Sequence, residues 1–155
     1  MVPISYLMCT SLFIQMPNLQ YPEVTIGALL YKKDKILLLK SHKWNDKYIL
    51  PCGHIEFGES ATDAVKREVK EETNLKVEDI EFLHIEELIN SNEFQDTKRH
   101  FVCLQFSCRA KSREVTLNDE AQEFIWTTPQ DALKLDIELI TRKTIEKYTK
   151  TQHVK

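Results

Sequence analysis

Short apolar runs separated by polar turns dominate the chain and predict a sheet with few helices. Residues 24–31 and 36–40 are rich in β-formers and aliphatic side chains. The polar segment Lys32-Lys33-Asp34-Lys35 separates these two runs. This pattern predicts two paired strands joined by a tight turn.

Four further strands and two C-terminal helical segments follow from the same pattern. Pro51 and Gly53 predict the end of the first of these strands. The polar stretch 90–98 predicts a loop between two longer strands. The expected strands are residues 48–50, 77–89, 99–110 and 124–126. The expected helical segments are 129–133, which Pro129 begins, and the amphipathic stretch 137–148.

A helix is predicted between Ser60 and Asn74. Ser60 is a favourable N-cap, and Asp63 supplies the acidic partner three residues later. A narrow apolar stripe follows at helical spacing, formed by Ala61, Ala64, Val65 and Val69. Asn74 predicts the end of the helix, because asparagine accepts the left-handed conformation better than most residues.

Length and composition fit one globular domain over residues 21–150. The chain has 155 residues, of which 42% are hydrophobic and 29% charged, so it can bury a core without disulfides. Its net charge of −3 and lack of a basic block argue against a protein that grips polymeric nucleic acid. The charged content also argues against a membrane protein.

Residues 1–20 carry no charge and differ from the rest of the chain. They lack the basic start of a signal peptide, and polar residues and prolines interrupt any membrane span. Two interpretations remain open, an apolar arm packed on the domain and an overextended gene start before Met16. The four cysteines form no C-x-x-C pair, which indicates reduced thiols in a cytoplasmic protein.

Three carboxylates on the predicted helix carry the chemistry. Glu68, Glu71 and Glu72 lie three or four residues apart and share one helix face. Like charges at this spacing repel, and partial burial strengthens the repulsion, so a bound cation would stabilise the cluster. The alternative is a solvated acidic face neutralised by neighbouring Lys and Arg side chains.

The surroundings of this cluster resemble the Nudix box, G-x5-E-x7-R-E-U-x-E-E-x-G-U, where U is a bulky aliphatic residue. Asn74 stands where that family has glycine, at the position that ends the helix. The matching residues are Gly53, Glu59, Arg67, Glu68, Val69, Glu71, Glu72 and Leu75.

The resemblance implies an α+β fold, an α/β/α sandwich with a central mixed β-sheet. It further implies that Glu68, Glu71 and Glu72 hold Mg²⁺, for which Mn²⁺ can substitute, and that Glu71 is catalytic. The carbonyl of Cys52 is expected as another metal ligand, although most relatives have glycine there. Many relatives are homodimers, and residues 1–20 are a possible interface.

Other candidate site residues surround the acids. Arg67 and Glu59 are expected to orient the ligands as a pair, with direct participation of Glu59 as the alternative. Glu120 matches a carboxylate that some relatives use as general base or metal ligand; an exposed loop acid is the alternative, and Glu123 the competing candidate. The candidate substrate-binding residues are Gly53, His54 and Phe57. The alternative for His54 is a surface histidine, and the alternative for Phe57 is packing within its loop.

The resemblance implies a small nucleotide substrate in which a nucleoside diphosphate is linked to another group. Signals of three Nudix subgroups are absent: a proline near 89–91, a tyrosine between Tyr48 and Tyr148, and a coenzyme A signature. The loop 53–60 is similar to that of relatives acting on nucleoside triphosphates. We therefore expect (deoxy)nucleoside triphosphate hydrolysis to monophosphate and pyrophosphate. The alternatives are an ADP-ribose or nucleotide-sugar pyrophosphatase and a non-catalytic nucleotide-sensing module.

Overall fold

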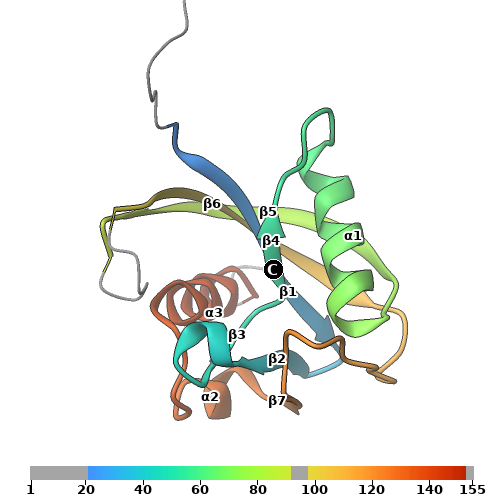
Figure 1. Ribbon diagram of the computed structural model, residues 1–155. Helices are drawn as coiled ribbons and strands as arrows, with labels where there is room; N and C mark the ends of the chain where they lie inside the picture. Colours follow the sequence, from blue (N-terminus) through green and yellow to red (C-terminus); the bar gives the residue numbers. More distant parts are fainter. Residues whose placement is uncertain (1–20, 92–97, 153–155) are drawn as a thin grey trace, which may run out of the picture.

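The structure, a computed structural model, describes residues 21–91 and 98–152, and both interpretations of residues 1–20 lie outside these ranges. The described part forms a mixed sheet with helices on both faces (Figure 1). The strands are β1 (Glu23–Lys32), β2 (Lys35–Ser41), β3 (Lys47–Ile49), β4 (Cys52–His54), β5 (Val77–Ile89), β6 (His100–Ala110) and β7 (Glu123–Thr127). The helices are the 3₁₀ turn η1 (His42–Trp44), α1 (Ala61–Thr73), α2 (Pro129–Ala132) and α3 (Leu139–Gln152).

The predicted hairpin forms the centre of the sheet. β1 and β2 pair antiparallel across a tight turn, where Lys33 has a φ of 58°. The other edge of β1 runs parallel to β6, from Glu23 opposite Phe101 to Tyr31 opposite Arg109. The main strand order is β3-β2-β1-β6-β5, with β4 paired to β1 and β7 to β2. The expected mixed sheet is confirmed.

Alternating side chains of β1 build the two cores of the sandwich. Leu30 packs on one face in a cluster that includes Val65 and Val69 of α1. Leu29 packs on the opposite face in a cluster that includes Ile145 and Tyr148 of α3. Because successive residues of a strand point to opposite faces, one apolar run supplies both layers. The α/β/α arrangement is confirmed.

Helix α1 has the boundaries that its sequence predicts. The Ser60 hydroxyl accepts a hydrogen bond from the backbone N–H of Asp63 at 3.2 Å. Asn74 ends the helix in the left-handed conformation, with φ 58° and ψ 12°. Asparagine therefore performs the geometric role of the glycine that it replaces in the box.

One strand was missed and one helix start was wrong. β3 ends at Ile49, before Pro51, as expected, but Cys52–His54 then forms a further strand, β4, which pairs antiparallel with Thr25–Gly27. The C-terminal helix begins at Leu139 instead of residue 137. Ile137 forms a bridge to Tyr48, and the Glu138 carboxylate accepts hydrogen bonds from the N–H groups of the first turn of α3.

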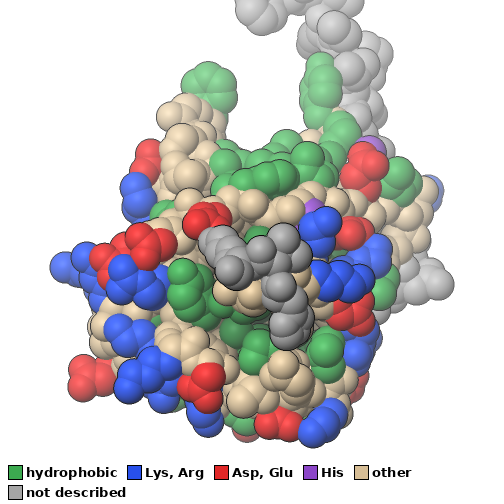
Figure 2. Space-filling model, turned by 180° about the vertical axis from the view of Figure 1, so that it is seen from behind, with side chains coloured by type: hydrophobic (Ala, Val, Ile, Leu, Met, Phe, Trp, Pro, Cys, Tyr) green, Lys and Arg blue, Asp and Glu red, His purple; other side chains and the backbone are tan. Residues whose placement is uncertain are grey.

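The surface of the described part is mixed in character. Figure 2 shows acidic and basic side chains interspersed on one face, with apolar side chains gathered near its upper end. Phe82, Ile85 and Ile89 of β5 are among the exposed apolar residues. The expected homodimer stays a prediction. Within residues 21–91 and 98–152, the helices are all too short or too polar to span a bilayer.

Candidate functional site

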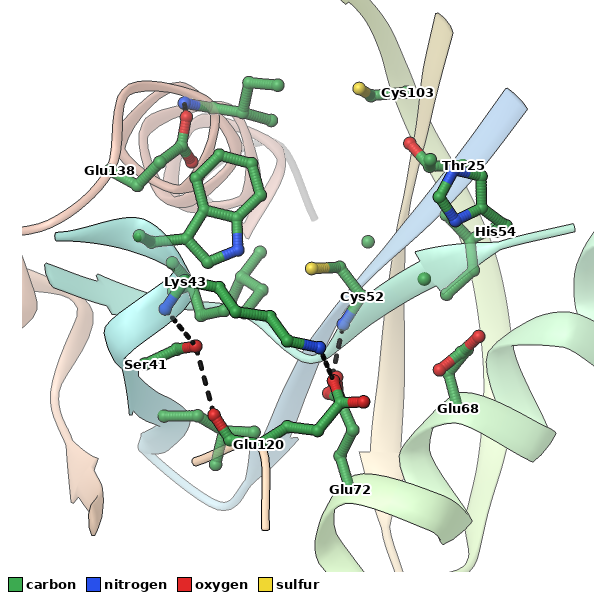
Figure 3. Close-up of a pocket in the computed structure, with 18 of the residues that line it drawn as sticks. Thr25, Ser41, Lys43, Cys52, His54, Glu68, Glu72, Cys103, Glu120 and Glu138 are labelled. Atoms are coloured by element: carbon green, nitrogen blue, oxygen red, sulfur yellow. Dashed lines mark hydrogen bonds and ion pairs between the residues drawn. The ribbon is translucent and has the colours of Figure 1, made fainter. Parts of the chain in front are cut away.

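A pocket of about 910 Å³ opens between α1, the β1–β4 pair, η1 and the loop before β7. Its volume lies within the range of small-molecule binding sites. Glu68, Glu72 and Glu120 line it together, and Figure 3 shows how their carboxylates approach from α1 and from the loop. The structure therefore joins the helix acids to an acid about fifty residues further along the chain.

The three box carboxylates of α1 differ in their environments. The side chain of Glu68 is 13% exposed and that of Glu71 is 54% exposed. Glu72 is buried, and one of its oxygens accepts a hydrogen bond from the Cys52 N–H at 3.2 Å. This bond joins β4 to α1 and places the backbone of Cys52 beside the acids. The expected role of the Cys52 carbonyl as a metal ligand stays a prediction.

Burial raises the pKa of Glu72 to about 8, and the nearby charge of Glu68 adds to this rise. Burial also raises the pKa of Glu68, although its hydrogen bond with Arg67 opposes the change. Arg67 and the N–H of Cys52 compensate the negative charge of this pair only in part. A cation bound between the carboxylates would do so.

Gly53 makes room for a carboxylate. A Cβ atom built on this residue would lie 2.0 Å from Oε1 of Glu68. Any other residue at this position would displace the Glu68 side chain. Gly53 also lines the pocket, and its expected role in substrate binding stays a prediction beside this steric one.

Arg67 organises the base of the site. Its Nε and Nη2 atoms each lie 2.9 Å from a different oxygen of Glu59, which makes a two-point ion pair. Nη1 reaches Glu68 at 2.7 Å and Glu71 at 3.3 Å. Nη2 also donates to the carbonyl of His54 at 2.9 Å. A planar guanidinium is suited to this fixed, many-sided contact.

Glu120 occupies the opposite wall of the pocket. Its Oε2 lies 2.9 Å from Nζ of Lys43, and its carbonyl accepts a hydrogen bond from the Ser41 hydroxyl at 3.1 Å. The competing candidate, Glu123, instead pairs with the Tyr48 hydroxyl at 2.5 Å and with Lys40 at 3.4 Å. Of the two acids, only Glu120 lines the pocket.

The remaining substrate-binding candidates have different positions. His54 lines the pocket, and its Nε2 lies 2.7 Å from Oε2 of Glu23. Phe57 is fully exposed in the loop before α1 and is not part of the pocket lining. The structure thus brings His54 to the pocket but not Phe57.

Sequence reasoning missed Lys43 and Ser41. Both lie where β2 passes into η1, on the wall beside Glu120. The signal available in the sequence was a lysine next to Trp44 in a loop, which has no distinctive spacing. Only the pairing of β2 with β7 shows that this loop meets Glu120.

The donor set suits a hard divalent cation, because it consists of carboxylate and carbonyl oxygens. Within the described residues, however, the acids do not form a ready group of three ligands. Glu71 is turned toward Arg67 and Glu120 toward Lys43. Arg67 also holds Glu68, at 2.7 Å, so a cation bound at these acids would replace or share the ion pairs that they now make.

Comparison with known proteins shows the family of the chain. Residues 21–148 match the model of the NUDIX domain. Nucleoside triphosphatase NudI of Escherichia fergusonii is 34% identical over 104 residues, which cover 64% of this chain and 74% of that protein. The same enzyme from Escherichia coli strain SE11 is 30% identical over the same coverage.

Solved structures share the fold. The MutT NUDIX hydrolase from Burkholderia pseudomallei superposes with a TM-score of 0.72 and 25% identity, covering 83% of this chain and 98% of that one. The NUDIX domain of Shewanella oneidensis NrtR, in complex with ADP ribose, has a TM-score of 0.72 at 18% identity, covering 86% and 90%. With the match over residues 21–148 and the acids assembled in one pocket, the chain belongs to the Nudix hydrolase family.

Proposed function

We propose that this protein hydrolyses (deoxy)nucleoside triphosphates to nucleoside monophosphates and pyrophosphate, with Mg²⁺ as the natural cation. The observation that carries the proposal is the convergence of Glu68, Glu72 and Glu120 in one nucleotide-sized pocket. The similarity to the nucleoside triphosphatase NudI supports the substrate class.

The acids provide the binding site that this reaction needs. Glu68, Glu71, Glu72 and the carbonyl of Cys52 would hold the cation, and one oxygen of Glu120 could join them while its other oxygen stays available to accept a proton. When bound, Mg²⁺ or Mn²⁺ screens phosphate charge and lowers the pKa of a bound water. Arg67, held by Glu59, fixes the orientation of the acids without contacting the substrate itself.

In the proposed reaction a water oxygen attacks phosphorus in line with the departing oxygen. A bond forms between the water oxygen and one of the two phosphorus atoms of the α–β bridge, the bond from that phosphorus to the bridging oxygen breaks, and monophosphate and pyrophosphate are released. Glu120 lies on the pocket wall opposite α1 and is suited to accept the proton from the water. No covalent intermediate is required.

Two observations weigh on the alternatives. The likeness to the ADP-ribose complex rests on 18% identity and concerns the fold alone, so it does not favour an ADP-ribose substrate. A sensing module would not need the acid cluster, whereas Glu68 and Glu72 are held in the pocket despite their mutual repulsion. Hydrolysis of triphosphates is therefore the function that we propose.

The test is a substrate screen with product identification. Nucleoside triphosphates, ADP-ribose, nucleotide sugars and dinucleotides are each incubated with and without Mg²⁺. We expect monophosphate and pyrophosphate from triphosphates, only with metal, and in ¹⁸O-water the labelled product identifies the phosphorus that is attacked. Preference for ADP-ribose, or release of inorganic phosphate from triphosphates, would reject the proposal.

A further inference from the structure

We propose that Lys43 is a substrate-binding residue, held by Glu120 in the metal-free enzyme and released to the substrate phosphates when a cation takes over Glu120. This inference rests on the proposed function and adds a residue that the Nudix box does not contain. It starts from the position of the Lys43 ammonium, which is directed across the pocket toward the acids (Figure 3).

The loops carrying Lys43 and Glu120 are tied together through their backbones. The buried hydroxyl of Ser41 accepts a hydrogen bond from the N–H of Lys43 at 3.3 Å and donates to the carbonyl of Glu120 at 3.1 Å. The N–H of Gln122 also donates to the carbonyl of Lys40 at 2.9 Å. The two side chains can therefore separate while their loops stay in place.

The contact between the side chains is easily exchanged. Nζ of Lys43 lies 2.9 Å from a single oxygen of Glu120, and the two side chains are 63% and 51% exposed. Solvent weakens an ion pair of this kind. A divalent cation at the acids competes for the same carboxylate with twice the charge.

Lys43 is also the pocket cation with the most freedom to move. Arg67 is held by both oxygens of Glu59, and Arg99 by both oxygens of Glu23. Lys43 has a flexible four-carbon stem that ends in a compact ammonium, and an ammonium binds phosphate oxygens as a point charge. A nucleoside triphosphate brings several negative charges into a pocket that is already lined by six glutamates, so a released lysine would favour its binding.

The proposal predicts effects of opposite sign in one variant, Lys43→Met. Loss of the competing ammonium should tighten Mn²⁺ binding without nucleotide by about threefold, the scale of an exposed ion pair. Loss of the phosphate contact should raise KM for the triphosphate about tenfold, with kcat changed much less. Mn²⁺ binding is measured on the full chain by the electron paramagnetic resonance signal of the free ion.

Lys66→Met is the matched control. Lys66 forms a similar exposed ion pair with Asp63 at 3.0 Å, but it does not line the pocket. We expect this variant to change neither Mn²⁺ affinity nor KM. Lys43→Arg retains the positive charge and should restore KM to within about threefold of the wild-type value.

Three results would overturn the role of Lys43: an unchanged KM in Lys43→Met, Mn²⁺ affinity that stays the same or falls, or equal changes in Lys66→Met. Each of these leaves the proposed function standing if the wild-type protein hydrolyses triphosphates. Failure of the wild-type protein to hydrolyse them would instead reject the proposed function, and the Mn²⁺ titration would still report on the exchange at Glu120.

Discussion

Contacts between single residues decide whether the acids of α1 can face the pocket. Gly53 gives Glu68 its space, and the N–H of Cys52 holds Glu72. Both positions lie on β4, a strand of three residues that pairs with β1. A short strand thus fixes the carboxylates of the helix that follows it in the chain.

Gly53→Ala should reduce kcat about 100-fold, because the new methyl group must displace the Glu68 carboxylate. The fold should survive, since a flexible side chain can move aside. Gly58→Ala is the control: no atom lies within 4 Å of its Cβ position, but its φ of +82° is unfavourable for alanine. It should cost about 1 kcal/mol of stability and retain activity. Full activity in Gly53→Ala would refute the steric role.

The raised pKa of Glu72 predicts an unusual dependence of the protein's stability on pH. Its folded-state pKa of about 8 lies above the ordinary value of 4.5, so the native state holds a proton that the unfolded state releases between these values. In the metal-free protein, the contribution of Glu72 to the free energy of unfolding should therefore fall as pH rises from about 4.5 to about 8.

Glu72→Gln should remove this loss and become more stable than wild type at pH 8, by on the order of a few kcal/mol. Urea unfolding of both proteins in EDTA, at several pH values, measures the difference. The difference between the two free energies should grow with pH across this window. Parallel profiles would show that Glu72 does not carry the buried charge.

At the scale of elements, Arg67 connects α1 to the loop before it and to β4. It joins Glu59, two helix acids and the carbonyl of His54. Arg67→Lys retains the charge but loses the planar fork. We expect kcat to fall about 10- to 100-fold, because the acids lose their fixed orientation.

The control for this substitution is Arg109→Lys, away from the pocket. Arg109 also bridges two acids, Glu78 at 2.8 Å and Asp79 at 2.7 Å, but it does not line the site. Its kcat should stay near the wild-type value. If both variants lose activity equally, the loss reflects general electrostatics and not the orientation of the acids.

Some elements could be predicted from the sequence and others could not. Helix α1 was predictable because Ser60, Asp63 and Asn74 determine its ends through local hydrogen bonding and backbone conformation. Strand β4 was not, because its pairing with Thr25–Gly27 joins residues distant in sequence. The start of α3 was misplaced for a similar reason, since Ile137 is held by a bridge to Tyr48.

At the scale of the whole molecule, the sheet brings separate parts of the chain to one pocket. The sequence located the acids of α1 because they share a recognisable spacing. It located Glu120 only by resemblance and missed Lys43, since their meeting depends on the pairing of β2 with β7. Phe57 was a candidate on residue type alone, and the fold leaves it exposed to solvent.

The central claim is that the pocket acids bind a divalent cation. Anomalous diffraction from crystals grown with Mn²⁺ and a non-hydrolysable nucleoside triphosphate tests it most directly. We predict an anomalous peak beside Glu68, Glu72 and the carbonyl of Cys52, with Glu71 or Glu120 rotated toward it. An ordered nucleotide in the pocket with no peak there, and with Glu71 still paired to Arg67 and Glu120 to Lys43, would contradict the claim.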